Sequence, residues 1–77
     1  MNFRIIGTID KQEIIATGSK FREINRLKKI YGDGKWRKMK GVAKIEMHDH
    51  SVFSAELHWY EAHGIGKKEY KIKRFLK

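Results

Sequence analysis

The stretch "MKGVAKIEMHDHSVFSAELHWY", residues 39–60, decides the fold of this chain. Apolar and polar side chains alternate along both of its halves, and this period of two indicates two β-strands. Polar residues 49–51 lie between the halves and suit a hairpin loop. The side chains expected on the core face are Ala43, Ile45, Met47, Phe53, Ala55, Leu57 and Trp59, and those expected on the outer face are Lys40, Val42, Lys44, Glu46, Ser54, His58 and Tyr60.

The pairing of the two strands is constrained by this pattern, because a slip of one residue would turn the apolar set of one strand to the polar face of the other. The register that keeps both apolar sets together around a three-residue loop pairs Ile45 with Ala55. It also sets Lys44 opposite Glu56, a favourable cross-strand charge pair. We therefore expect this register, with Tyr60 accessible on the outer face.

Residues 19–31 carry apolar side chains at spacings of three and four, which is helical periodicity. The segment begins with a serine, a favourable N-cap, and is followed by Gly32, a favourable residue for a helix end. We expect the apolar side of this helix to cover the sheet, with Trp59 buried against Leu27 or Ile24.

The two ends of the chain supply further strands. "FRIIGTID", residues 3–10, and "EIIATG", residues 13–18, favour two strands joined by a turn at Asp10 and Lys11, although Asp10 and Glu13 could instead begin a short helix. "EYKIKRFL", residues 69–76, alternates until its end and predicts a further antiparallel strand with a bulge or an edge position. The sequence thus predicts a single α+β domain over residues 1–77, a mainly antiparallel sheet of three to five strands with one helix packed on it.

Composition favours an anionic partner. Eighteen Lys and Arg residues against nine Asp and Glu residues give a net charge of +9 on 77 residues. A charge of this density is typical of proteins that bind RNA, DNA or acidic surfaces, although it also promotes solubility. Cysteine is absent, and no apolar run is long enough for a signal peptide or a membrane span. We expect a cytoplasmic protein with no membrane partner.

The predicted outer face combines cations with an aromatic ring, as surfaces that bind single-stranded nucleic acid do, because cations contact phosphates and rings stack on bases. The alternative is a solvated lysine face. The glycine-rich "GIGKK" loop, residues 64–68, is either a tight hairpin connection or a phosphate-binding nest. The predicted nucleic-acid-binding residues are Lys40, Lys44, His58, Tyr60, Lys67, Lys68, Lys71 and Lys73.

Catalysis and metal binding have weaker support in the sequence. Neither the segment around His48 and His50 nor the pair His58 and His63 has a strong ligand spacing, and we expect neither a metal nor another cofactor. Glu61 and His63, with Tyr60 and Lys68 nearby, have the acid, base and cationic groups that a metal-independent ribonuclease needs. Residues this common occur together by chance, so we treat catalysis as an alternative.

Two resemblances accompany these patterns. "YGDGKWRKMKGVAKIE" followed by "AELHWYEAHGIGKKEYKIKRFL" is similar to small basic prokaryotic proteins of uncharacterised function, which implies a prokaryotic, cytoplasmic source and no specific activity. "KWRKMKGVAKIEM" resembles the segment through which RelE-type toxins, small basic ribonucleases, enter their antiparallel sheet. This chain has one expected helix where those toxins have two, so no catalytic residue is carried over.

The predicted function is a non-catalytic nucleic-acid-binding module, with RNA somewhat ahead of DNA. The alternatives are a small metal-independent ribonuclease of the RelE-toxin kind and an adaptor that binds an acidic protein. The nucleic-acid-binding hypothesis rests on the net charge and on the predicted outer face. The ribonuclease hypothesis rests on Glu61 and His63, and the adaptor hypothesis rests on the net charge alone.

Overall fold

The computed structural model describes residues 2–18 and 21–76. Its elements are β1 (Phe3–Thr17), α1 (Ile24–Tyr31), β2 (Trp36–Met47), β3 (Val52–Ala62) and β4 (Ile65–Leu76). The strands form one antiparallel four-stranded sheet in the order β1-β2-β3-β4. The predicted antiparallel sheet is therefore confirmed, and β1 and β4 are its edges.

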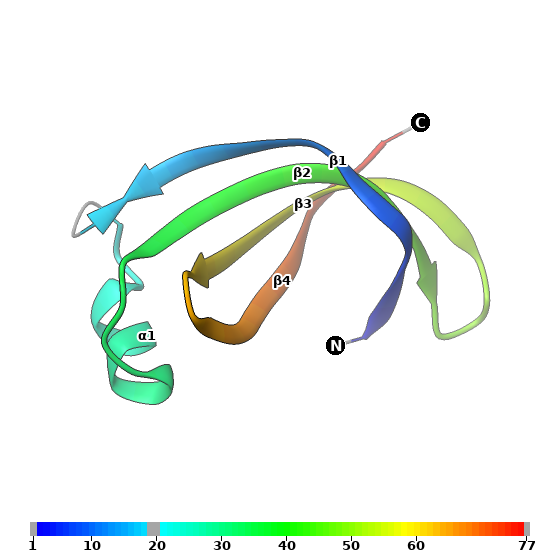
Figure 1. Ribbon diagram of the computed structural model, residues 1–77. Helices are drawn as coiled ribbons and strands as arrows, with labels where there is room; N and C mark the ends of the chain where they lie inside the picture. Colours follow the sequence, from blue (N-terminus) through cyan, green and yellow to red (C-terminus); the bar gives the residue numbers. More distant parts are fainter. Residues whose placement is uncertain (1, 19–20, 77) are drawn as a thin grey trace.

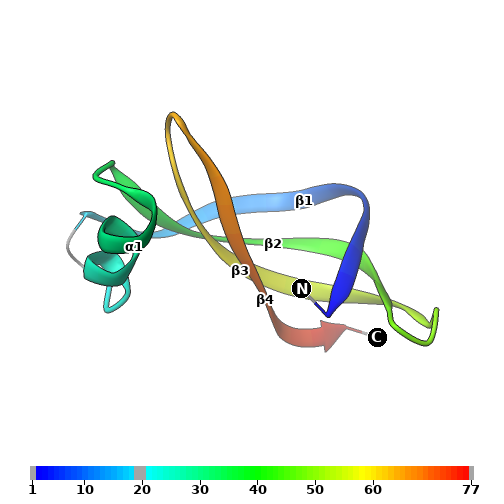
Figure 2. The same cartoon turned by 90° about the horizontal axis from the view of Figure 1, so that it is seen from below.

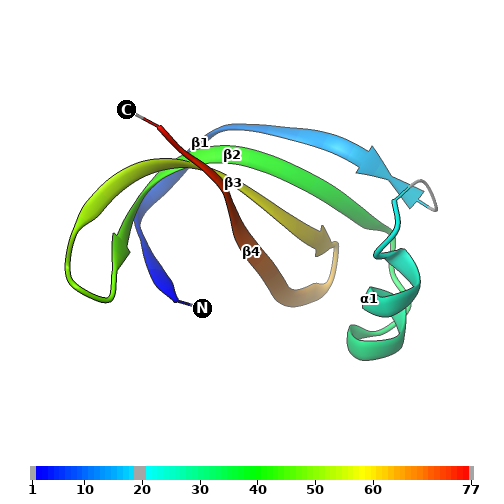
Figure 3. The same ribbon diagram turned by 180° about the vertical axis from the view of Figure 1, so that it is seen from behind.

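The sheet is strongly curved. Figure 1 shows β1 and β2 as an arch with α1 at one end and the β2–β3 hairpin at the other. Figure 2, seen from below, shows how far the strands twist as they run from the helix end to the hairpin end. In Figure 3, seen from behind, the edge strand β4 lies nearest the viewer. The described helix is too short and too polar to cross a membrane.

The N-terminal segment is one strand and not the two that the sequence favoured. Its pairing with β2 shifts register three times, between Ile6 and Asp10, between Asp10 and Glu13, and again near its end. Lys11 adopts a positive φ of 54°, so the expected turn residues form an irregularity within β1. The turn and the alternative capping-box helix at this position are both wrong, because the segment pairs with β2 both before and after the irregularity.

The β2–β3 hairpin has the predicted faces but a different register. Ile45 pairs with Phe53 and Ala43 with Ala55, a shift of two residues from the predicted pairing. Lys44 therefore lies opposite Ser54 and not opposite Glu56. A shift by two preserves which side chains share a face, and this is why the alternation alone could not exclude it.

The hairpin loop explains the shift. The backbone N–H of Met47 donates to the carbonyl of Ser51 at 2.9 Å, so the loop keeps the expected three residues but consists of residues 48–50 and not of residues 49–51. The backbone N–H of His50 donates to the carbonyl of Met47 at 2.9 Å, and His50 takes a left-handed φ of 69°. This conformation closes the strands at a register that the alternation pattern does not encode.

α1 is shorter than the predicted helix. It begins at Ile24 after the N-cap Glu23, whose side chain makes no capping hydrogen bond, and the expected capping position, Ser19, lies outside the described residues. The backbone N–H of Gly32 donates to the carbonyl of Lys28 at 3.0 Å, so the helix ends at Gly32 as predicted.

Buried side chains form two clusters. We call the first the helix cluster; it consists of Phe21, Ile24, Leu27, Trp36, Tyr60 and Ala62. The second, the sheet cluster, consists of Met39, Ala43, Ile45, Ala55, Leu57 and Trp59. Trp59 and Tyr60 are adjacent in β3, so the clusters lie on opposite faces of that strand. We call these faces the Trp59 face and the Tyr60 face.

The placement of Trp59 and Tyr60 relative to α1 corrects the prediction. Trp59 is buried, but its cluster contains no residue of α1. Tyr60 is only 9% exposed and stacks on Phe21, with ring centroids 5.4 Å apart. The expectation that Tyr60 is accessible is wrong because side chains of α1 and of the segment before it cover that end of the outer face.

Candidate nucleic-acid interface

The predicted site residues gather mainly on the Tyr60 face and along β4. Lys40 pairs with His58 across β2 and β3, and His58 pairs with Lys71 across β3 and β4. Lys44 follows further along the same face of β2. These four side chains therefore share the face on which the sequence placed them.

The remaining lysines lie on the edge strand. Leu57 pairs with Ile72 and Glu56 with Arg74, so Lys73 is the extra residue of a bulge and is exposed. Lys68 is exposed near the start of β4, whereas the side chain of Lys67 lies outside the described part of the chain. The "GIGKK" segment enters β4 directly after a two-residue turn, as the hairpin interpretation expected.

The ring of Tyr60 is not available as the stacking platform that we predicted, because Phe21 covers it. Burial raises the pKa of its hydroxyl above the usual value, which is consistent with a largely desolvated phenol. The Nζ of Lys38 lies 5.9 Å from the centre of the same ring.

Carboxylates alternate with the cations of the Tyr60 face. Lys40 Nζ lies 2.9 Å from Glu13 Oε1, and this hydrogen bond raises the pKa of Lys40. His58 Nε2 lies 2.7 Å from Glu56, whose pKa is lowered first by that hydrogen bond and then by Arg74. The middle of this face is therefore a ladder of ion pairs and not a uniformly basic surface.

Arginine and lysine differ in their surroundings. Each of the six glutamates of the chain forms an ion pair. The partner is an arginine for every glutamate except Glu13, which pairs with Lys40. Glu56 also contacts His58, and Glu46 also contacts His50. Among the lysines whose side chains the structure describes, only Lys40 has a carboxylate within 4.0 Å. Among the described side chains, the positive charge outside ion pairs is thus carried mainly by lysines, with the exposed Arg22 as a further cation.

One network fastens α1 to β4. Arg26 bridges Glu23 and Glu69, and its two contacts to Glu69 are 2.8 and 3.0 Å long. The hydroxyl of Tyr31 donates to the same carboxylate at 2.6 Å. The hydrogen bonds from Arg26 and Tyr31 lower the pKa of Glu69 to about 2, so this carboxylate stays ionised and holds the helix end in place.

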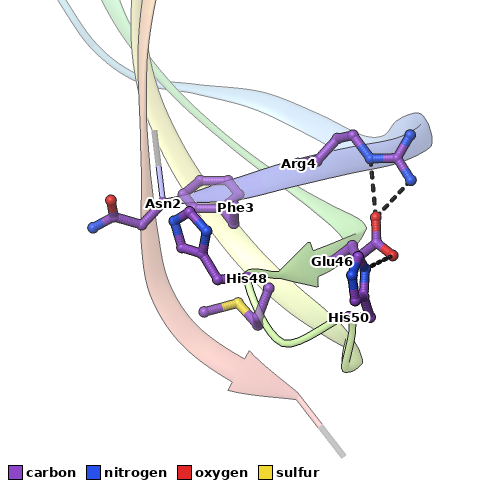
Figure 4. A pocket seen from close by; sticks show the side chains of 7 residues that line it. Asn2, Phe3, Arg4, Glu46, His48 and His50 are labelled. Atoms are coloured by element: carbon purple, nitrogen blue, oxygen red, sulfur yellow. Dashed lines mark hydrogen bonds and ion pairs between the residues drawn. The ribbon is translucent and has the colours of Figure 1, made fainter.

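The tip of the β2–β3 hairpin carries the histidines of the metal hypothesis. Figure 4 shows Arg4 and His50 on one side, both joined to Glu46, while His48 lies apart beside Asn2 and Phe3. The two imidazoles do not converge, and no group of three metal-ligating side chains occurs within residues 2–18 and 21–76. The contacts with Arg4 and His50 lower the pKa of Glu46. Glu46 therefore stays ionised, and the positive charge of Arg4 balances its negative charge.

The carboxylate of the ribonuclease alternative, Glu61, is engaged by other side chains of the sheet. Glu61 accepts hydrogen bonds from Trp59 Nε1 at 2.7 Å and from Arg37. Burial opposes ionisation of Glu61, but these two donors lower its pKa overall. His63 lies exposed in the β3–β4 turn. A carboxylate held by two donors is a poor proton acceptor for a substrate hydroxyl.

A groove that the sequence did not indicate lies between the end of β1, α1 and the start of β2. Its volume is about 440 Å³, and Ile14, Ile24 and Trp36 supply its apolar lining. Lys28 and Lys35 border it, and no acidic side chain lines it among the described residues. No single motif could have signalled it, because its walls come from three elements.

Comparison of the chain with family models, with curated proteins and with solved structures found no match, so the interface rests on the geometry of this molecule alone.

Proposed function

We propose that this protein is a non-catalytic nucleic-acid-binding module that prefers RNA and contacts phosphates through lysines of the β4 edge and the Tyr60 face. The observation that carries the proposal is that the glutamates are paired while most lysines are not. Glutamates are occupied by ion pairs, while Lys44, Lys68, Lys71 and Lys73 are exposed and have no carboxylate within 4.0 Å among the described side chains. Such lysines release counterions from a polyanion on binding.

The edge position of β4 supports the same surface. An edge strand presents its side chains and one row of backbone groups without a neighbour, so an extended chain can lie along it. Lysines at sheet edges also protect against unwanted strand pairing. The two roles differ in what they predict, because only binding makes the affinity for a polyanion depend on individual lysines.

The first test is a binding titration with single-stranded RNA, duplex DNA and heparin at several salt concentrations. Lys71→Ala and Lys73→Ala should each weaken RNA binding and reduce the slope of log affinity against log salt by about one unit. Lys29→Ala, at an exposed position of α1 outside the proposed surface, is the matched control with the same change in net charge. Equal effects from all three substitutions would show that the charge acts diffusely and that there is no site.

The ribonuclease alternative is tested in the same preparation. We expect RNA to remain intact after incubation with the wild-type protein and with His63→Ala, since Glu61 is held by Trp59 and Arg37. Metal-independent cleavage by the wild type that disappears in His63→Ala would instead favour the enzyme.

The groove beside α1 favours a second candidate, the adaptor for an acidic protein. An apolar floor bordered by Lys28 and Lys35 suits an acidic segment with aliphatic side chains. Lys28→Glu with Lys35→Glu should abolish binding of such a peptide and leave RNA binding along β4 nearly unchanged. Loss of RNA binding in this variant, with Lys71→Ala silent, would move the nucleic-acid interface to the groove.

A further inference from the structure

Two phenylalanines stand out among the aromatic residues of the chain. Phe53 on β3 is 43% exposed and Phe75 on β4 is 53% exposed, while every other aromatic side chain is buried or half-buried. Their ring centroids are 5.3 Å apart in an edge-to-face arrangement. The two rings therefore form one accessible aromatic surface, which we call the Phe53–Phe75 platform.

The platform lies on the Trp59 face, beyond the part of that face that is closed. Phe53 pairs with Ile45 and Phe75 with Ala55, both fully buried members of the sheet cluster. Neither phenylalanine belongs to that cluster. The apolar stripe of the sheet thus continues into solvent as two exposed rings, and such a patch indicates a binding surface.

A shallow hollow adjoins the platform. It has a volume of about 500 Å³, within the range of small-ligand sites, and besides Phe53 and Met47 its walls are formed by Asn2, His48, Asp49 and Ser51. Figure 4 shows His48 and Asn2 side by side at this end of the sheet. Amide, imidazole, carboxylate and hydroxyl groups provide both donors and acceptors.

This combination of groups favours an unpaired base over an aliphatic protein surface. A base needs an aromatic face for stacking and polar groups for its edge, and both are present here. Both hydrogen bonds that Ser51 donates to Asp49 go to Oδ1, at 3.0 Å from the backbone N–H and 2.5 Å from the hydroxyl. They lower the pKa of Asp49, so it remains an acceptor for the N–H groups of a base.

Phosphate contacts are available next to the platform. Lys73 and Arg74 precede Phe75 in β4, and Lys73 is the exposed bulge residue. Arg74 shares Glu56 with His58, so its charge is only partly free. Arg74 lies opposite Glu56 on the Tyr60 face and Phe75 opposite Ala55 on the Trp59 face, so a single strand would meet these cations and rings by passing around the β4 edge.

We propose that the Phe53–Phe75 platform stacks unpaired bases of single-stranded RNA and that one base enters the hollow lined by Asn2 and His48. This inference rests on the proposed function and assigns the stacking role that the sequence had given to Tyr60. Duplexes, whose bases are already stacked and paired, are bound through phosphates alone.

The decisive variants are Phe53→Leu and Phe75→Leu, which keep an apolar side chain of similar size and remove the aromatic face. Both positions are exposed, so the fold should persist, and thermal unfolding checks this. Each variant should bind a short single-stranded RNA at least about fivefold more weakly, the low end of the loss expected for one base–aromatic stack, with an unchanged salt slope. An RNA that contains 2-aminopurine should lose fluorescence on binding to the wild type and lose less with either variant.

Two controls separate stacking from other effects. Val52→Ala changes the neighbour of Phe53, which is 52% exposed on the opposite face, and should leave RNA affinity unchanged. An abasic strand of the same length keeps the phosphates, so it should bind the wild type and both Phe→Leu variants equally. Duplex RNA should likewise be insensitive to these substitutions.

The contrary outcomes are distinct. If the Phe→Leu variants bind like the wild type while Lys71→Ala weakens binding, the phosphate surface stands and the platform is overturned. If the wild type binds no single strand at all, both proposals are overturned. If the wild type self-associates and Phe75→Leu abolishes that association without changing RNA affinity, the platform is a protein interface and the proposal is likewise overturned.

Discussion

We expect Tyr60 to contribute to stability and not to recognition, because it is only 9% exposed and its ring stacks on Phe21. Tyr60→Ala would leave a cavity in the helix cluster and should lower the free energy of unfolding by about 3 kcal/mol. Tyr60→Phe keeps the ring and should be close to neutral. Urea denaturation measures both, and a stable Tyr60→Ala protein with weakened RNA binding would restore the original stacking role.

Gly41 of β2 lies close to both neighbouring strands, β1 and β3. A Cβ at this position would lie 2.5 Å from Ile9 Cγ2, 3.1 Å from the carbonyl of Asp10 and 3.1 Å from the ring of Trp59. Gly41→Ala should therefore destabilise the protein by about 1 to 3 kcal/mol through overpacking. Gly66→Ala is the control, since a Cβ there meets nothing within 4 Å. Equal midpoints of thermal unfolding for the two variants would contradict this account of Gly41.

At the scale of elements, the contact between α1 and β4 depends on the charge of Glu69. Its pKa of about 2 in the folded protein lies below the usual 4.5, because Arg26 and Tyr31 hydrogen-bond to the carboxylate. A lowered folded-state pKa stabilises the fold above pH 4.5, and this stabilisation is lost as the pH falls from 4.5 through about 2.

Glu69→Gln should thus lower stability at neutral pH and reduce the pH dependence of unfolding between pH 4.5 and 2 by up to one proton. Tyr31→Phe removes one of the donors and should have a smaller effect in the same direction. Urea unfolding at a series of pH values measures the slope. Parallel curves for the wild type and Glu69→Gln would show that the network does not couple helix docking to this carboxylate.

The elements also show what the sequence could predict. Alternation within 39–60 predicted the two faces of the hairpin, because side-chain direction follows directly from strand geometry. It could not predict the register, since a shift by two keeps Ile45 on its face and only the loop conformation at His50 decides between the alternatives. It also could not predict which face the helix cluster occupies, because Trp59 and Tyr60 are both large apolar rings that a core can accept.

The site was predictable in the same partial way. The sequence predicted the lysines of β4, because they form a basic, alternating segment. It could not predict that these lysines have no acidic partners, because that depends on which cations pair with the glutamates of other strands. Phe53 was expected in the core from its place in the alternation. The register puts it beyond the closed part of the sheet, where it meets Phe75.

At the scale of the whole molecule, charge is distributed by residue type. Glutamates pair with arginines between neighbouring elements, as in Arg4 with Glu46 and Arg37 with Glu61, and these pairs add no net charge. The net charge of +9 is therefore carried mainly by the lysines, of which the chain has thirteen against five arginines. Mutual repulsion among them destabilises the compact state, and a polyanion that binds the folded protein relieves it.

This arrangement predicts how stability responds to salt. Added NaCl screens the repulsion and should raise the melting temperature of the wild type. Replacing Lys44, Lys68, Lys71 and Lys73 by Gln removes four positive charges that have no carboxylate within 4.0 Å among the described residues. This variant should melt at a higher temperature than the wild type at low salt and at nearly the same temperature at high salt. Arg4→Gln is the control, because Arg4 already pairs with Glu46 at 2.6 Å, and its loss should give no gain at low salt. Heparin should stabilise the wild type and the Arg4→Gln protein more than the four-lysine variant. If heparin stabilises all three equally, these lysines are not where the polyanion binds.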